Sequence, residues 1–439
     1  MMADANASIV RGFDRAGDHL VVGGITVEEI ASRVGTPFFV YDTDRMDHRL
    51  RLLRDALPDR FDVYYSIKAN PAQGILRFFL ERGCGLEVAS AGELHQALAA
   101  GCSASRVLFA GPGKTTGELE YAARQEVGEI HVEGFDEIDE LSRIAAAGAT
   151  PILVAIRVNP RSEAQGGAMR MGGKPAVFGI DEERLDEAVD RVLARPGLEL
   201  AGVHLFAGTL ILDWEVLAAQ YRKGVEIGLK AAARSGLPLR TLDFGGGLGI
   251  PYYAGDAELD IRAYGRAVSE LIDETGPRPE LANTRFLVEP GRYLVGDSGV
   301  YVTRVISVKR SRGKVFVVVD GGMHHHLAAS GNLGQVIKRN FPLVVANRMG
   351  QATALKADVA GPLCTPLDVL GRNVELPNVE AGDLVAVLQS GAYARAASPL
   401  GFLSHPAPPE VAVAAGRARL IRRRSDHEAT LADQCDERL

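Results

Sequence analysis

A lysine at the end of an apolar run is the first residue that could do chemistry. The segment YYSIKANP covers residues 64–71 and places Lys68 where a β-strand would end. Partial removal from water disfavours the ammonium form of a lysine, and the neutral amine can form a Schiff base with a carbonyl compound. A lone lysine in such a place is more often an ordinary solvated side chain, so Lys68 gains meaning only together with other signals.

Two further segments supply complementary groups. LDFGGGLGIPY covers residues 242–252, and VEPGR covers residues 288–292. Consecutive glycines leave backbone N–H groups open to bind a phosphate, but their spacing does not match a dinucleotide fingerprint. In VEPGR, Glu289 can hydrogen-bond a protonated ring nitrogen, and Arg292 can bind a carboxylate or a phosphate. An amine, a phosphate loop and a carboxylate are what pyridoxal 5'-phosphate (PLP) requires of a protein.

The elements that must position these groups alternate between strands and helices. The eight expected strands are residues 62–68, 86–89, 107–110, 129–133, 152–158, 198–206, 241–244 and 285–288. The expected helices are residues 91–100, 117–125, 181–194, 214–234 and 261–274, and Asp181 is placed to cap the third of them. This alternation predicts parallel pairing and favours an α/β fold, the (β/α)8 TIM barrel, over an open sheet. Catalytic residues of such barrels lie at the C-terminal ends of the strands, where all three segments fall.

The pattern changes after about residue 295, where Gly/Pro turns separate short β-rich runs. The expected strands are residues 300–308, 314–320, 352–359, 384–388 and 410–414. They predict a mainly antiparallel β domain, and strands near residues 20–22 and 38–42 can pair with it. We therefore expect three parts. These are an N-terminal segment (1–45) that contributes strands to the β domain, a PLP-binding barrel (46–295) and a C-terminal β domain (296–439).

Composition excludes several classes of protein. The chain has 439 residues with 49 basic and 56 acidic side chains, a net charge of −7, which argues against nucleic acid as a partner. The cysteines lie far apart, at Cys84, Cys102, Cys364 and Cys435, so no disulfide framework or local zinc site is encoded. No apolar run approaches the ~18 residues of a membrane span. We expect a cytoplasmic protein that binds no membrane.

The chain resembles the fold-type III PLP-dependent decarboxylases, which include the diaminopimelate, ornithine and arginine decarboxylases, with alanine racemase as a more distant relative. The motifs that carry this resemblance are YYSIKANP, GLEVASAGEL, GVHLFAGTLI, LDFGGGLGIPY, VEPGR, VVVDGGMHHH, GPLCTPLD and SGAYARAASP. GAMRMGGKPAVFGID and HHHLAASGNLGQVIKRNFP are similar to a subgroup with exosortase-associated enzymes and the carrier-protein-linked glutamyl decarboxylase of butirosin biosynthesis. The resemblance implies an alanine racemase-like fold, PLP as cofactor, and loss of the α-carboxylate from an amino acid or a carrier-bound aminoacyl group.

The resemblance also implies residue roles. Lys68 would carry PLP as a Schiff base, and Glu289 would keep its ring nitrogen protonated. Arg292 would contact substrate or phosphate, and the phosphate-binding set would be Gly246, Gly247, Gly291 and Tyr393. Cys364 would return a proton after carbon dioxide leaves, with a buried apolar role as the alternative. Asp368 would line the substrate end, and Cys364 and Asp368 would enter the site from the partner subunit of a head-to-tail homodimer.

The sequence departs from these relatives at the substrate end. Phe206 stands where relatives have a ring-stacking histidine, and His204 precedes it on the same strand face, so either ring can face the cofactor. The segment CTPLD (364–368) lacks the glutamate that reads the distal ammonium of diaminopimelate, and a buried charge needs a partner. Met323 and three histidines replace an expected polar cluster. A carrier-bound aminoacyl group therefore fits better than lysine production.

Other readings stay open. They are a diaminopimelate decarboxylase of lysine biosynthesis, an amino-acid racemase and a PLP-binding protein without catalysis; Cys364 argues against the second, and the β domain argues against the third. On a strand, His324 and His326 would share one face, which is too few ligands, so no metal site is expected. The basic segment RARLIRRR (417–424) is interpreted as a solvated or dimer-facing surface.

Overall fold

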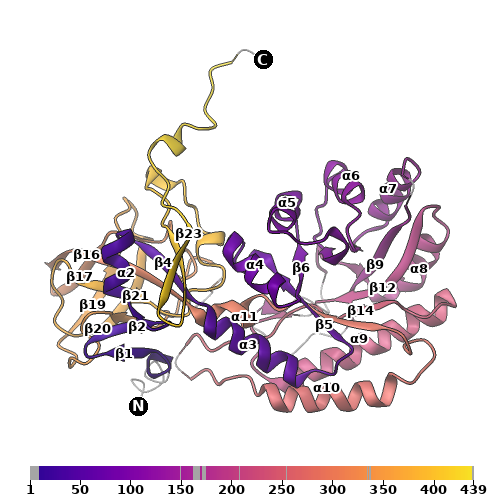
Figure 1. The fold of residues 1–439 in the computed structure, drawn as a ribbon, viewed down its shortest axis with the longest axis horizontal. Coiled ribbons are helices and arrows are strands. Elements are labelled where there is room, and N and C mark those ends of the chain that lie inside the picture. The colour runs from indigo at the N-terminus through magenta and orange to yellow at the C-terminus, as the bar shows by residue number, and fades with distance from the viewer. Residues whose placement is uncertain are drawn as a thin grey trace. The chain divides into compact units, whose positions relative to one another are not determined.

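The computed structural model describes residues 9–437 apart from 149, 162–168, 171–174, 207, 254, 334 and 336–337. Parts of the two similarity segments at 167–181 and 324–342 thus lie outside the described residues. The chain divides into two compact units (Figure 1). The barrel unit comprises Arg49–Ile250 and Ala257–Tyr293, and the β unit comprises Met1–His48, Pro251–Asp256 and Leu294–Leu439.

The barrel unit is built on eight strands that pair only in parallel. They are β5 (Phe61–Ser66), β6 (Gly85–Val88), β7 (Val107–Phe109), β8 (Glu129–Val132), β9 (Ile152–Asn159), β12 (Leu198–Leu205), β14 (Thr241–Asp243) and β15 (Arg285–Val288). The sheet closes because β15 pairs with β5 and β8 pairs with β9. All eight predicted strands are present, and the predicted TIM barrel is confirmed. Short β11 (Ile180–Asp181) extends the sheet beside β9, and β10 (Met169–Arg170) pairs with β13 (Gly208–Thr209).

Amphipathic helices follow the strands and cover the outside of the barrel (Figure 1). They are α3 (Thr43–Ala56), which precedes β5, α4 (Gln73–Glu81), α5 (Ala91–Ala99), α6 (Thr116–Gln125), α7 (Phe135–Ala145), α8 (Leu185–Leu193), α9 (Trp214–Ser235) and α10 (Ile261–Thr275). The short α11 (Arg292–Val295) follows β15. Among the described residues, no helix is both long and apolar enough to cross a membrane.

The expected cap of α8 is wrong. Asp181 precedes a 3-10 turn, Glu182–Arg184, and makes no capping hydrogen bond with its side chain. Its carboxylate instead accepts from Asn159 Nδ2 at 3.0 Å, which ties β11 to the end of β9. The helix begins one turn later, and the buried face predicted for it is present: Leu185, Ala188, Val189 and Val192.

The β unit contains a mixed sheet in the order β20-β19-β17-β16-β4-β22-β23, with β21 and β18 on a branch from β16. Its strands are β4 (Phe38–Asp42), β16 (Gly299–Ser311), β17 (Lys314–Val319), β18 (Leu343–Val345), β19 (Leu355–Ala360), β20 (Val369–Leu376), β21 (Leu384–Val387), β22 (Glu410–Ala414) and β23 (Arg417–Arg422). Pairing is antiparallel except for β17 with β19 and β22 with β4. The N-terminal strand β4 therefore lies between two strands from the far end of the chain.

A smaller sheet completes the β unit. It consists of β1 (Asp14–Ala16), β2 (His19–Val22) and β3 (Ile25–Thr26), followed by helix α2 (Val27–Val34). The side chain of Thr26 accepts a hydrogen bond from the Glu29 amide and caps α2. Leu20, Val22 and Ile30 of this layer are buried in one cluster with residues of β4, β16 and β22.

The close approach of β12 to β14 depends on Gly202. A Cβ at this position would lie 1.8 Å from the carbonyl oxygen of Thr241, which is backbone and cannot rotate away. We expect Gly202→Ala to lower the free energy of unfolding by roughly 2–4 kcal/mol, because the two strands would have to separate. Gly117→Ala is the matched control, since a Cβ there would meet nothing within 4 Å. Urea unfolding measures both, and equal stability of the two variants would contradict the prediction.

Candidate active site in the barrel

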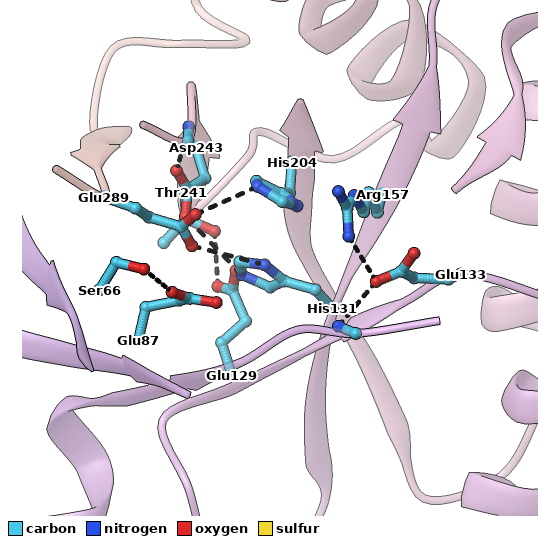
Figure 2. Close-up of polar contacts among 12 residues, drawn as sticks. Ser66, Glu87, Glu129, His131, Glu133, Arg157, His204, Thr241, Asp243 and Glu289 are labelled. Carbon is cyan, nitrogen blue, oxygen red and sulfur yellow. Dashed lines mark hydrogen bonds and ion pairs between the residues drawn. The ribbon is translucent and has the colours of Figure 1, made fainter. Parts of the chain in front are cut away.

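Polar side chains from most of the strands converge inside the barrel (Figure 2). Strand β8 shows why they point there. Residues 129–133 read EIHVE, so Glu129, His131 and Glu133 share one face while Ile130 and Val132 share the other. The helices cover the outer face, so the polar face must line the barrel interior. All five side chains are buried.

Lys68 lies in a 3-10 turn, Ile67–Ala69, directly after β5. Its Nζ lies 2.8 and 2.9 Å from the two carboxylate oxygens of Glu87 on β6. Ser66 donates a hydrogen bond to the same carboxylate, which is 1% exposed. The Lys68 side chain itself is 44% exposed, less buried than the sequence argument supposed, because the turn carries it beyond the end of the strand. The contacts with the Glu87 carboxylate, and not apolar packing, thus hold the amine in place.

Glu289, directly after β15, occupies the centre of the cluster and is 6% exposed. Its Oε2 lies 3.4 Å from His204 Nε2 on β12, and its Oε1 lies 3.9 Å from His131 Nδ1. Burial opposes ionisation, but His204, His131 and Lys68 outweigh it and lower the pKa of Glu289 below its ordinary value. Burial lowers the pKa of His204 to about 4, so this imidazole is neutral near pH 7. Glu289 is therefore a buried carboxylate anion.

The pKa of Asp243, at the end of β14, shifts in the opposite direction to that of Glu289. Asp243 is fully buried, and burial together with the neighbouring Glu289 raises its pKa well above the ordinary value. Its Oδ1 accepts the Gly245 amide at 2.7 Å, which anchors the glycine loop to the strand. Its Oδ2 lies 3.8 Å from His131 Nε2. The pKa values of the two carboxyls are thus pushed apart, upward for Asp243 and downward for Glu289, as expected when two acids share a buried site.

The glycine loop is pressed against neighbouring backbone. Gly245 has φ +64° and Gly247 has φ +98°, a region that favours glycine. A Cβ on Gly246 would lie 2.6 Å from the Glu289 carbonyl oxygen, and one on Gly247 would lie 2.9 Å from the Gly208 carbonyl oxygen. The VEPGR turn packs equally closely, since a Cβ on Gly291 would lie 3.0 Å from the Ala69 side chain. Both predicted glycine segments therefore pack against Glu289 or against the turn that carries Lys68.

These residues fit PLP on two observations. Glu289 Oε1 is buried and has no hydrogen-bond partner among the described residues, which suits a ring N–H donor. The cradle formed by residues 245–247 admits no side chain, which suits backbone binding of a phosphate. Arg292 is half-buried at the start of α11 in the same unit. Lys68, Glu289 and the glycines are thus brought together as predicted; their roles toward the cofactor remain predictions.

The two candidate stacking rings lie at different depths. His204 is 1% exposed and contacts the His131 ring at a centroid distance of 4.4 Å. Phe206 is half-buried and borders the glycine loop, where a Cβ on Gly245 would lie 3.1 Å from its ring. His204 therefore belongs to the polar cluster, and Phe206 belongs to the rim.

The remaining predicted residues lie in the β unit. Cys364 is exposed in the single chain, and its role stays a prediction. Asp368 is 2% exposed, and its oxygens accept the amides of Met323 at 2.7 Å and Leu363 at 2.9 Å. Tyr393 is half-buried and has φ +53°, a left-handed conformation that costs energy in a residue with a Cβ.

The sequence analysis places the three consecutive histidines on a strand, and this prediction is wrong. His324, His325 and His326 lie in a turn that follows Gly321 and Gly322, and all three are buried. Burial lowers their pKa values to about 4, 2 and 3, so they are neutral near pH 7. His325 contacts the Tyr301 hydroxyl at 3.0 Å and His326 contacts the Ser390 hydroxyl at 3.0 Å, which is a structural use.

Sequence reasoning missed the polar interior of the barrel. The missed residues are Glu87, Glu129, His131, Thr241 and Asp243. The available signal was the alternation of residues 129–133, because polar residues on the inner face of a buried parallel strand are unusual. Among the described residues, one group has ligand atoms close enough for a metal ion, namely His131, His204, Asp243 and Glu289, within 4.8 Å of one another.

The raised pKa of Asp243 makes a prediction about stability. The unfolded chain ionises this carboxyl above about pH 4, whereas the folded protein binds the proton more tightly, so the wild type loses stability as pH rises toward the folded pKa. Asp243→Asn removes this dependence. We expect its stability relative to wild type to grow by about 1.4 kcal/mol per pH unit from pH 4 until the folded pKa is reached.

Urea unfolding between pH 5 and pH 8 measures this difference. The exposed Asp273→Asn on α10 is the control and should show a difference that does not change with pH. A constant difference for Asp243→Asn as well would mean that Asp243 is ionised in the folded protein.

Comparison with known proteins identifies the family of the chain. Residues 43–296 match the family described as "Pyridoxal-dependent decarboxylase, pyridoxal binding domain". The L-glutamyl-[BtrI acyl-carrier protein] decarboxylase of Niallia circulans is 38% identical over 411 residues, which cover 93% of this chain and 96% of that protein. The diaminopimelate decarboxylase of Zymomonas mobilis is 32% identical and covers 94% of this chain and 96% of its own length.

Solved structures show the same fold. The crystal structure of Helicobacter pylori diaminopimelate decarboxylase with L-lysine has a TM-score of 0.82 at 28% identity and covers 92% of this chain and 98% of that chain. Both relatives in sequence are named as decarboxylases, which leaves the racemase and the non-catalytic alternatives without support. With a lysine, a buried carboxylate and a glycine cradle at one rim of a closed barrel, this chain belongs to the fold-type III PLP-dependent decarboxylases.

Proposed function

We propose that this PLP-dependent decarboxylase acts on an aminoacyl group attached to a carrier protein, with a glutamyl thioester as the first substrate to test. The Niallia circulans relative is named for such a substrate. The observation in this chain that carries the proposal is the loop at 364–368. This loop offers no free carboxylate for the distal ammonium of diaminopimelate, ornithine or lysine.

The geometry of the loop supports this point. Asp368 is its only acid, and two backbone amides occupy its oxygens. Burial raises the pKa of Asp368, which further weakens it as an anion. Thr365 stands where diaminopimelate decarboxylases carry glutamate, and its hydroxyl accepts the Leu367 amide at 3.3 Å. A buried ammonium without a carboxylate partner binds poorly, so a substrate lacking that group is favoured.

The barrel residues have separate tasks in the proposed reaction. Bound PLP would supply an electron sink for the bond that loses carbon dioxide. Lys68 holds the cofactor covalently, and Glu87 orients the Lys68 amine through its two short contacts. Glu289 holds a proton on the ring nitrogen, and the glycine loop with Gly291 binds the phosphate. Phe206, at the rim, is the ring that stacks on the cofactor, while His204 supports Glu289.

The β unit completes the site in a homodimer. Cys364 of the partner subunit supplies the proton that replaces the carboxylate, and an exposed thiol is suited to that task. The partner's Asp368 positions this loop rather than binding substrate directly. Tyr393 and Arg292 contact the phosphate or the substrate carboxylate. The cytoplasmic location expected from the sequence stays a prediction.

Substrate choice tests the proposal directly. We expect carbon dioxide release from a glutamyl carrier protein to exceed that from free diaminopimelate, ornithine, lysine or glutamate by at least ~100-fold in kcat/KM, because the loop lacks the distal partner. Thr365→Glu should raise turnover of diaminopimelate above the wild-type level, whereas the uncharged Thr365→Gln should not. Brisk wild-type turnover of diaminopimelate would assign the chain to that activity instead.

A mixing experiment tests the shared site. Lys68→Ala and Cys364→Ala should each reduce turnover by ~1,000-fold or more, because each lacks one reacting group. If each site combines Lys68 with Cys364 of the partner subunit, re-associated mixtures contain heterodimers with one intact site and should regain about a quarter of wild-type activity. Lys230→Ala on the exposed face of α9 is the control for a lost surface charge. No recovery on mixing would place both residues in one subunit's site.

A further inference from the structure

A continuous line of contacts runs behind Glu289 on the inner face of the barrel (Figure 2). The Thr241 hydroxyl donates to Glu129 Oε2 at 2.6 Å. The other oxygen of Glu129 lies 3.1 Å from His131 Nε2. The opposite nitrogen of the same ring, Nδ1, lies 3.9 Å from Glu289 Oε1, the oxygen suited to the cofactor ring. Thr241, Glu129 and His131 thus form a chain of contacts, called the relay below, that ends at Glu289.

We propose that His131, fixed by Glu129 and Thr241, is a positioning residue that keeps Glu289 ionised and aimed at the cofactor ring. The imidazole lies between two carboxylates, Glu129 and Glu289, which are 3% and 6% exposed. A buried carboxyl group needs a polar partner to replace the water it has lost, and the imidazole faces one on each side. The hydrogen bond between Glu129 and Nε2 also restricts the orientation of the His131 ring.

The neighbours of Glu289 explain why this task falls to His131. His204 is neutral, so it offers a dipole rather than a full charge. Asp243 is a second buried acid, whose pKa is raised by burial and by Glu289, and it offers Glu289 no attraction. Lys68 is engaged by Glu87 through two short contacts. His131 is the neighbour of Glu289 whose ring also contacts a second buried carboxylate, Glu129, so its position is fixed from behind.

The first test measures binding of the cofactor and its absorbance rather than catalytic turnover. PLP is removed by dialysis, and its rebinding is followed by the absorbance near ~420 nm expected of the Lys68 linkage. We expect His131→Asn and Glu129→Gln to weaken PLP binding by about tenfold or more and to shift or diminish this band, because Glu289 loses its fixed charge. Thr241→Val should act in the same direction with a smaller effect, since it leaves both charged partners in place.

Kinetics separate positioning from simple loss of stability. With saturating PLP, His131→Asn should lower kcat by about 10- to 100-fold and leave the substrate KM within about twofold, because the effect lies at the cofactor. The double variant with Glu129→Gln should be no worse than His131→Asn alone, since both act through one contact. Tyr221→Phe, which removes a buried hydroxyl contact with Tyr264 at 2.5 Å elsewhere in the barrel, should lower thermal stability and change neither readout.

Two outcomes would overturn the proposal. One is a His131→Asn protein that binds PLP with wild-type affinity, spectrum and kcat; if that variant does not fold, the same result for Glu129→Gln decides. The other is one tightly held divalent metal per chain in the purified enzyme, since His131, His204, Asp243 and Glu289 would then be ligands rather than partners of the cofactor. Metal analysis of the wild type therefore accompanies the titration.

Discussion

Glu289 imposes the central constraint on the barrel, because it is an anion placed where water cannot reach it. A carboxylate removed from water costs several kcal/mol unless charges and hydrogen bonds replace the lost solvation. Much of the interior polar architecture does this: His204 and His131 face its two oxygens, and the pKa of the nearby Asp243 is raised, which reduces repulsion between the two acids. Oε1 of Glu289 has no hydrogen-bond partner among the described residues, so it can still accept a hydrogen bond.

Closure of the barrel is what makes this arrangement possible. Lys68 and Glu289 are more than two hundred residues apart in sequence, yet they follow β5 and β15, which are neighbours because the sheet closes. The Ser66 amide donates to the Pro290 carbonyl at 3.4 Å, so the two strand ends are joined directly. An open sheet with the same strands would leave these ends at opposite edges, and the three predicted segments would not form a site.

The sequence predicted the barrel well because its strands are short apolar runs between turn signals, and that pattern is local. Strands β20 and β23 were missed because many of their side chains are exposed and charged, as in the RARLIRRR segment, which gives no apolar alternation. The relay through Glu129 and His131 was missed for another reason. Each residue looks ordinary by itself, and only the closed barrel shows that Thr241 from a later strand lies behind them. The roles of Cys364, Asp368 and Tyr393 rest on resemblance and stay predictions.

The position of β4 has a consequence for biosynthesis. This strand pairs with β16 through Phe38–Tyr41 and with β22 through Phe39–Asp42. During translation, β4 leaves the ribosome before the barrel, while β16 follows the barrel and β22 comes still later. Its hydrogen-bonding edges must therefore wait unpaired throughout synthesis of the intervening chain, a period in which strand edges invite association with other chains. The nascent β4 is the segment for which protection by a chaperone would matter most.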